Sequence, residues 1–380
     1  MDWVDWTILV AKVVVVFVGL LLAVLLYIWM ERKVIADLQT RTGPLRAGPR
    51  GILITLADGI KLFFKEGIRP TNADRPVYLL APVLAMIPAF LAFAVIPFGA
   101  GVTIAGREVS LQLADLDIGV LWVLAMTSLG VYAVVLAGWS SGSNYPLLGG
   151  VRSSAQMISY EVAMGLALIA VLMFSGNLRM SEVVAAQSTV WYVIPQFPAF
   201  VIFLICALAE VNRPPFDLAE AESELVAGFH TEYSGITFAL FYLGEYVNTV
   251  TVSAIAVTLF LGGWQGPFVD RVGWLSVVWF LLKLTAVIYV FILVRGTLPR
   301  MRYDRLMNFG WKALIPVGLF WVLATGAIVI LPTRYDDVVI TLGSVEITRG
   351  VLLAVGLVVG VGLLASLVKP LLDRPHEEAR

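Results

Sequence analysis

The chain has 380 residues, of which 59% are hydrophobic and only 14% are charged, and its formal net charge is −1. Soluble domains carry about 25% charged residues, so lipid is needed to cover part of this apolar surface and a soluble protein is excluded. The near-neutral charge also argues against a nucleic-acid partner, because phosphate binding needs clustered Lys and Arg side chains.

Long apolar runs predict an all-α polytopic membrane protein that forms a single membrane domain over residues 1–380. A spanning helix needs about 20 apolar residues, and backbone amides in lipid must find partners within their own helix. Nine runs fit, although the fifth contains Pro195 and Pro198 near its start and the ninth is an additional, glycine-rich C-terminal span. The predicted spans are Thr7–Met30, Val77–Phe98, Ile118–Gly138, Met157–Ser175, Trp191–Ala209, Gly235–Leu261, Trp274–Val294, Ala313–Leu331 and Gly350–Val368.

The connections between these spans differ strongly in basic residues. One alternating set holds 19 of the 26 Lys and Arg residues, and the other set holds five. Cytoplasmic connections carry the excess of Lys and Arg. The pattern therefore predicts an inner-membrane protein with its N-terminus outside and its C-terminus in the cytoplasm.

The first predicted cytoplasmic loop, residues 31–75, contains a segment too short to span. Within Gly51–Phe64, six apolar residues fall on one side of a helix, and Asp58 lies on the far side. This pattern predicts an amphipathic helix lying in the membrane interface. The alternative is a core helix packed on the spans.

Three carboxylates occur in apolar spans, namely Glu161, Glu210 and Glu245. A charge at such depth costs several kcal/mol, so intramembrane carboxylates usually line an aqueous path or pair with another group. We expect these residues to carry protons. The alternative is a structural ion pair, for example with Lys283.

The connection at residues 210–234 is an acidic loop on a side where basic residues are expected. Pro214 and Pro215 end the incoming helix, and Asp217 followed by Glu220 fits a capping box that opens a short helix. The loop is either a solvated acidic connection or a set of partly buried carboxylates that titrate together. His230 is expected to be an exposed loop residue rather than a metal ligand.

Several motifs, in this order, resemble the NuoH family, the quinone-channel membrane subunit of proton-pumping NADH:quinone oxidoreductase, respiratory complex I. One departure is Ile54-Thr55, where that family usually has Gln-Pro. The motifs are Glu31-Arg-Lys-Val, Leu56-Ala-Asp-Gly-Ile-Lys, Gly138-Trp-Ser-Ser-Gly-Ser-Asn, Arg152-Ser-Ser-Ala-Gln, Ala209-Glu-Val-Asn-Arg-Pro-Pro-Phe-Asp and Pro299-Arg-Met-Arg-Tyr-Asp.

The resemblance implies a subunit of an enzyme complex, with no complete active site on this chain alone. The quinone, ubiquinone or menaquinone, would enter a chamber lined by Arg32, Asp58, Arg213 and Phe216. The link to proton pumping would use six carboxylates, Glu161, Glu210, Glu220, Glu222, Glu224 and Glu245.

The partners implied are the peripheral-arm subunits of the quinone site, the neighbouring membrane subunits and the lipid bilayer. Electrons would arrive from NADH through flavin and iron–sulfur centres in other subunits. This chain would bind no metal, flavin or cluster, which agrees with its single cysteine, Cys206. Two alternatives remain: the related membrane subunit of a hydrogenase or formate hydrogenlyase, and a stand-alone ion transporter, for which an inverted repeat is expected but not found.

Overall fold

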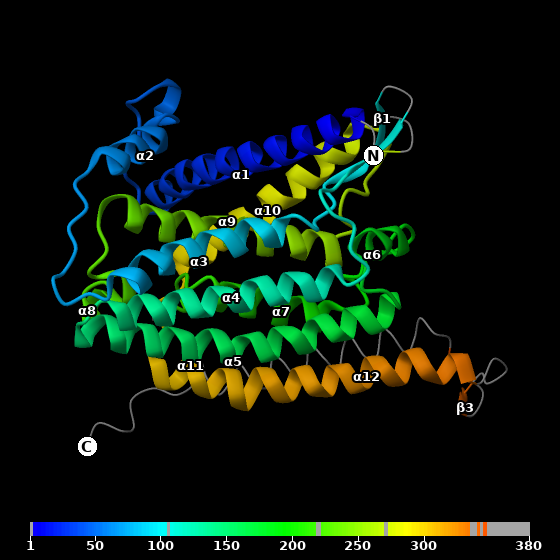
Figure 1. The fold of residues 1–380 in the computed structure, drawn as a ribbon. Coiled ribbons are helices and arrows are strands. Elements are labelled where there is room, and N and C mark those ends of the chain that lie inside the picture. Colours follow the sequence, from blue (N-terminus) through cyan, green and yellow to red (C-terminus); the bar gives the residue numbers. More distant parts are fainter. Residues whose placement is uncertain are drawn as a thin grey trace, which may run out of the picture.

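Long helices lie side by side in the computed structural model, which describes residues 3–104, 107–217, 222–269, 273–334, 340–342 and 345–347 (Figure 1). Within these ranges, seven helical stretches are long and apolar enough to cross a membrane. The predicted all-α, polytopic fold is thereby confirmed. The long helices are α1 (Trp3–Leu38), α3 (Arg75–Phe93), α4 (Gly119–Ser140), α5 (Asn144–Ser175), α9 (Gly235–Phe260), α10 (Leu275–Thr297) and α12 (Ile315–Arg334).

Shorter elements connect the long helices. Two antiparallel hairpins pair β1 (Gly99–Ile104) with β2 (Arg107–Leu111) and β3 (Ile340–Leu342) with β4 (Val345–Ile347). Gly99 lies opposite Leu111 in the first hairpin, and Ile340 lies opposite Ile347 in the second. The short helices are η1 (Pro49–Gly51), α2 (Ile54–Phe64), α6 (Met180–Ala186), α7 (Phe197–Glu210), α8 (Glu222–Leu225), η2 (Gly228–His230), α11 (Tyr303–Phe309) and the π-helical turn η3 (Gly310–Leu314).

The fifth predicted span is wrong in its length, because α7 has only 14 residues and begins at Phe197. At 1.5 Å per residue such a helix covers about 21 Å, less than the hydrocarbon core. Pro198 lies in its first turn, where a missing backbone N–H leaves no helical hydrogen bond unmade. The proline pair therefore marks a late helix start rather than a flaw in a full span.

The fourth predicted span is too short, since α5 begins at Asn144 and not at Met157. Its extra turns are polar and rich in small residues, so hydropathy alone cannot reveal them. They are helical because they pack closely: a Cβ atom on Gly138 of α4 would lie 2.5 Å from the carbonyl oxygen of Pro146. The ninth predicted span, Gly350–Val368, lies outside the described residues.

The two predicted sets of connections lie at opposite ends of the bundle (Figure 1). The loop with α2, the start of α5, α8 and α11 gather at one end, whereas β1, β2 and α6 lie at the other. We call these the α8 end and the α6 end. The alternation of sides agrees with the sequence, and the assignment of the α8 end to the cytoplasm stays a prediction.

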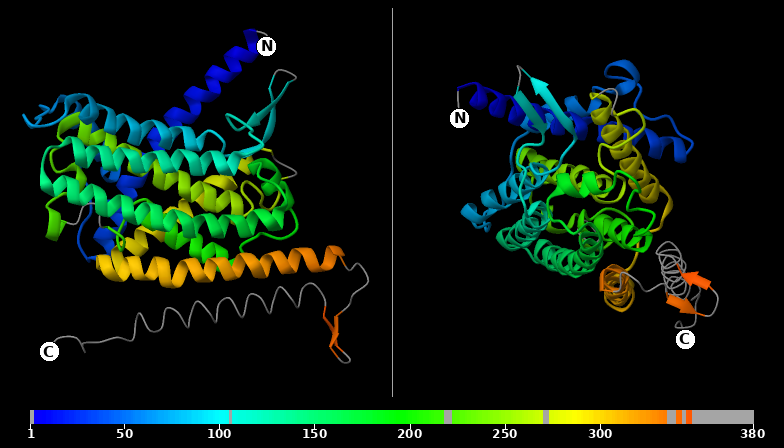
Figure 2. Two further views of the ribbon diagram at one scale, coloured as in Figure 1. Left: turned by 60° about the horizontal axis from the view of Figure 1, so that its bottom comes forward. Right: turned by 90° about the vertical axis from the view of Figure 1, so that its right-hand side faces the viewer.

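Helix α9 lies at the centre of the bundle. In the most apolar stretch of α9, 83% of the residues are buried, whereas only 11% are buried in the most apolar stretch of α1. Gly244 allows this packing, since a Cβ atom there would lie 2.8 Å from the carbonyl oxygen of Ala85 on α3. By contrast, the first half of α1 stands away from the other helices (Figure 2), and its buried residues begin only at Leu20.

Helix α2 exposes its apolar side chains. Ile60, Phe63 and Phe64 are 52%, 72% and 88% exposed. Thr55 is buried and donates a hydrogen bond of 3.2 Å from its hydroxyl to the carbonyl of Leu25, so this departure from the family pattern joins α2 to α1. The open apolar face is compatible with an interfacial helix, and the position of α2 in the membrane interface stays a prediction.

Lys283 closes the α6 end of helix α9. Its Nζ donates hydrogen bonds to the carbonyls of Leu261, Gly263 and Gln265 at 2.6, 3.1 and 2.6 Å, and it lies 4.1 Å from the ring centroid of Trp191. A cation at a helix C-terminus is favoured by the helix dipole. The role of Lys283 is therefore to cap α9.

We expect the Lys283→Met substitution to lower the thermal unfolding midpoint of the purified complex. It leaves carbonyl groups without their buried donor, and one such group costs about 1–3 kcal/mol. Lys312→Met, at an exposed position, is the control and is expected to leave the midpoint unchanged. Equal unfolding midpoints for both variants would show that the Lys283 cap contributes nothing to thermal stability.

Candidate functional site

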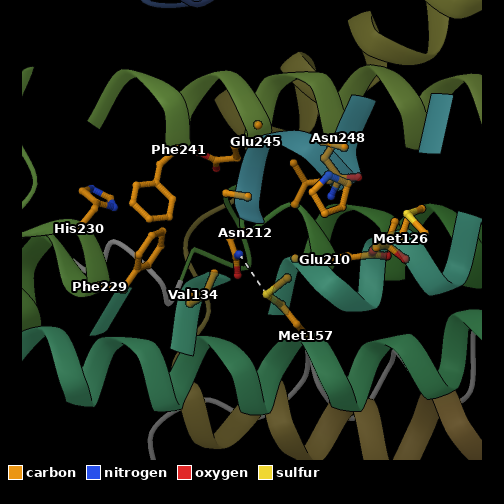
Figure 3. A pocket seen from close by; sticks show the side chains of 17 residues that line it. Met126, Val134, Met157, Glu210, Asn212, Phe229, His230, Phe241, Glu245 and Asn248 are labelled. Carbon is orange, nitrogen blue, oxygen red and sulfur yellow. Dashed lines mark hydrogen bonds between the residues drawn. The ribbon is translucent and has the colours of Figure 1, made fainter. Parts of the chain in front are cut away.

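A cavity with a volume of about 80 Å³ lies inside the bundle among α3, α4, α5, α7 and α9 (Figure 3). A buried water needs about 10–15 Å³ of such volume, so the cavity has room for several. Most of its wall is apolar, including Ala85, Met126 and Phe241. Its polar lining consists of Thr127, Glu210, Asn212, His230, Glu245 and Asn248.

Glu245 projects from the middle of α9 and pairs with Arg213. The distance from Arg213 Nε to Glu245 Oε1 is 3.3 Å, and the Arg213 side chain is 6% exposed. Its guanidinium carbon also lies 4.2 Å from the centroid of the Tyr246 ring. Burial alone would lower the pKa of Arg213, but Glu245, Tyr246, Glu31 and Tyr27 together outweigh burial and raise this pKa well above its ordinary value. Arg213 is therefore a fixed positive charge.

The same charged network continues to α1 and α10. The hydroxyl of Tyr246 donates a 2.8 Å hydrogen bond to Glu31, and Arg295 forms an ion pair with the same carboxylate. Glu31 is buried although it follows the first predicted span directly. Glu31 is not among the site residues predicted from the sequence. The sequence feature that could have identified it is an acidic residue placed between the end of an apolar run and two basic residues.

Glu210 reaches the cavity from the end of α7. It is 4% exposed, and among the described residues none forms a hydrogen bond with its Oε2 atom. Glu210 and Glu245, two of the carboxylates predicted from the sequence, therefore line the same cavity. Glu245 does form an ion pair, as the structural alternative expected, but its cation is Arg213 rather than Lys283, which caps α9.

Glu161 does not line this cavity. It is half-buried on α5 and accepts a hydrogen bond from Ser128 of α4. It still lies close enough to Glu210 for the two charges to interact. Glu161 is therefore held between α4 and α5, outside the cavity that Glu210 and Glu245 line.

The acidic loop is folded back against the bundle. Glu224 accepts a 2.7 Å hydrogen bond from Arg152 of α5, which holds the pKa of Glu224 below its ordinary value. This pair is therefore intact at neutral pH and is lost only as pH falls through the lowered pKa. Glu220 lies outside the described residues, as does part of the predicted capping box. Glu222 begins α8, and its side chain is not described.

The prediction that His230 is an exposed loop residue is wrong. His230 is 7% exposed, and its ring packs edge-on against Phe229, Phe238 and Tyr242. The loop can fold inward because Gly149 of α5 leaves room: a Cβ atom there would lie 2.8 Å from Gly228. The residues next to His230 in the sequence give no indication of this contact with α5, so its burial could not be predicted locally.

The four residues predicted for the quinone chamber do not form one cluster. Arg32 and Asp58 form an ion pair of 2.9 Å between α1 and α2. Phe216 is buried and packs on Tyr160, with ring centroids 5.7 Å apart. Arg213 lies at the charged network described above. Within the described ranges, no group of three or more His, Cys, Asp or Glu side chains is arranged to hold a metal ion.

The chain resembles known proteins over nearly its whole length. A family model described as NADH dehydrogenase matches residues 11–326. The chain belongs to the NADH dehydrogenase family. A relative from Frankia casuarinae, named as the H subunit of NADH-quinone oxidoreductase, is 56% identical over 358 residues, which cover 93% of this chain and 79% of the relative. A relative of the same name from Frankia alni is 53% identical over 370 residues, covering 96% of this chain and 80% of the relative.

The family confirms the resemblance that the motifs carry. This chain of the NADH dehydrogenase family is a multi-pass membrane subunit of an oxidoreductase complex. The names of both relatives argue against the hydrogenase and transporter alternatives.

Proposed function

We propose that the chain walls part of the quinone chamber of an NADH-quinone oxidoreductase and links quinone reduction to proton translocation. The quinone, ubiquinone or menaquinone, is the substrate of the complex. The observation that carries the proposal is the cavity in which Glu245, paired with Arg213, faces the space that Glu210 also lines. Carboxylates at such depth are expensive and are kept for ion or proton pathways.

The quinone would enter from the bilayer at α1, α2 and α9. Helix α2 presents Phe63 and Phe64 at the surface, where an isoprenoid tail needs an apolar contact. Arg32 and Asp58 bridge α1 and α2 at the same end of the bundle. The headgroup would then pass toward Arg213 and Phe216, with peripheral-arm subunits completing the reduction site at the α8 end.

Reduction of the quinone would change the charge at the α8 end. Glu224 lies there, and a rearrangement of the acidic loop, in which we expect Glu220 and Glu222 to take part, would act on Glu245 through Arg213. A local charge change with a distant effect is the general form of such switches. Protons would then pass by Glu210 and Glu161 to neighbouring membrane subunits. With this end in the cytoplasm, the N-terminus lies outside.

The test replaces each cavity carboxylate by its neutral isostere. Glu245→Gln and Glu210→Gln are each expected to lower NADH:quinone turnover about a hundredfold or more, the lower end of what proton-transfer groups contribute. NADH oxidation by ferricyanide, which takes electrons before the quinone, is expected to stay unchanged and reports assembly.

The matched control is Glu182→Gln. Glu182 pairs with Arg179 at 3.6 Å at the α6 end and is 46% exposed. It is expected to keep full turnover and proton pumping. Assembled complexes that turn over and pump normally with both cavity carboxylates neutralised would rule out the proposed coupling role.

A further inference from the structure

We propose that Asn248 is a positioning residue for proton transfer in the cavity. Its side-chain amide orients the water molecules that join Glu245 to Glu210. This inference rests on the proposed function of the two carboxylates and assigns a role to a residue that carries no charge.

Asn248 lies where such a bridge is needed. It follows Glu245 by three residues on α9, so the two side chains share a helix face. Both line the cavity that Glu210 also lines, and in Figure 3 Glu245 and Asn248 reach into it from α9, while Glu210 approaches from another helix. The three side chains thus enclose one space.

Two residues that line this space each have a buried oxygen atom without a hydrogen-bond partner among the described residues. No described residue forms a hydrogen bond with Oδ1 of Asn248, nor with Oε2 of Glu210. Buried polar atoms are almost always satisfied by protein or by ordered water. The cavity that Asn248 and Glu210 line has a volume of about 80 Å³, and water held there is the partner that we infer for their side chains.

The chemistry of the amide suits this task. An asparagine side chain both accepts and donates hydrogen bonds, but it does not titrate. It can therefore orient water on both sides without trapping the proton. Asparagine is also a poor helix former and a costly residue at membrane depth, where polar side chains mark ion pathways.

The neighbouring wall makes Asn248 hard to replace. Ala85, Ala89 and Met126 line the same cavity and offer no hydrogen bond from their side chains. Genuinely empty cavities in proteins are apolar. Other polar side chains of the lining, such as Thr127 and Asn212, still hold water in the cavity. Replacing the amide by a hydrocarbon of similar size is expected to remove only the water that Asn248 orients between the carboxylates.

The test compares Asn248→Leu with Asn248→Ser in the assembled complex. The Leu variant is expected to lower NADH:quinone turnover about tenfold, the effect of about 1.4 kcal/mol on a barrier, with ferricyanide reduction unchanged. The Ser variant, which keeps a hydroxyl that donates and accepts, is expected to retain most of the turnover. Thr251→Val is the control on the same helix, because the Thr251 hydroxyl bonds only to the backbone carbonyl of Val247.

A solvent deuterium isotope effect separates positioning from packing. If the water path is broken, proton transfer limits turnover in the Leu variant and the isotope effect rises above that of the unmodified complex. A packing defect would lower the turnover rate without raising the isotope effect, and this result would overturn the inference. Should Asn248→Leu fail to assemble, Asn248→Met, with a more adaptable side chain, is measured in the same way.

The outcomes for the two proposals are distinguishable. Full turnover and pumping by Asn248→Leu, with Glu245→Gln and Glu210→Gln both impaired, would overturn only the role of Asn248. Normal activity of the two carboxylate variants would instead overturn the proposed function itself.

Discussion

Replacing Arg213 by Met is expected to abolish quinone-linked turnover and to destabilise the protein. The substitution leaves Glu245, whose side chain is 23% exposed, without its cation. Breaking a fully buried ion pair by removing one partner costs about 3–5 kcal/mol, and this partly buried pair is expected to cost less. It also removes the cation that lies 4.2 Å from the Tyr246 ring centroid. NADH:quinone activity in membranes, normalised to assembled complex, measures the effect.

The control for this variant is Arg302→Met at the same end of the bundle. The Arg302 side chain is 79% exposed and lies 3.5 Å from Asp304. Exposed pairs contribute about 0–1 kcal/mol, so little change is expected. A second variant, Arg213→Met combined with Glu245→Gln, is expected to recover assembly but not turnover. Recovered turnover in the double variant would mean that the pair is only structural.

The Gly244→Val substitution is expected to prevent assembly of the complex. A Cβ atom at Gly244 would lie 2.8 Å from the carbonyl oxygen of Ala85, and this neighbour is backbone that cannot rotate away. Overpacking typically costs about 1–3 kcal/mol and sometimes more. Because Gly244 adjoins Glu245, separation of α3 and α9 would also deform the cavity.

Gly165→Val tests whether this effect is specific. Gly165 is also helical, but a Cβ atom there would meet nothing within 4 Å. We expect normal amounts of this variant in the membrane, measured by immunoblot and by ferricyanide reduction in native gels. If both variants were lost from the membrane to the same extent, valine itself would disfavour these helices. The close approach of α3 and α9 would then not be the cause of the assembly defect of Gly244→Val.

Most spans could be predicted because lipid forces long apolar runs into helices. The exceptions share one physical cause, which is that their conformation depends on contacts rather than on hydropathy. The first turns of α5 contain polar residues and Arg152, yet they are helical because Gly138 and Gly149 let neighbours approach. Similarly, α7 begins late because Pro198 occupies its first turn.

The candidate site was predictable in its members but not in its pairings. Glu210 and Glu245 stand out because each is an acid in an apolar run. Their meeting in one cavity depends on how α7 and α9 cross, and the sequence alone does not give this crossing. The partner of Glu245 is Arg213 rather than Lys283, since Lys283 satisfies carbonyls just after α9. Burial of His230 likewise follows from the fold of the whole loop.

The cap on helix α9 has a mechanical consequence. Lys283 holds three carbonyls at the α6 end, and Gln187 adds hydrogen bonds there to the carbonyl of Thr258 and from the amide of Gly262. The opposite end of the same helix meets the acidic loop, and the Arg213 pair lies at its middle. A displacement of that loop would therefore reach Glu245 while the α6 end of α9 stays held.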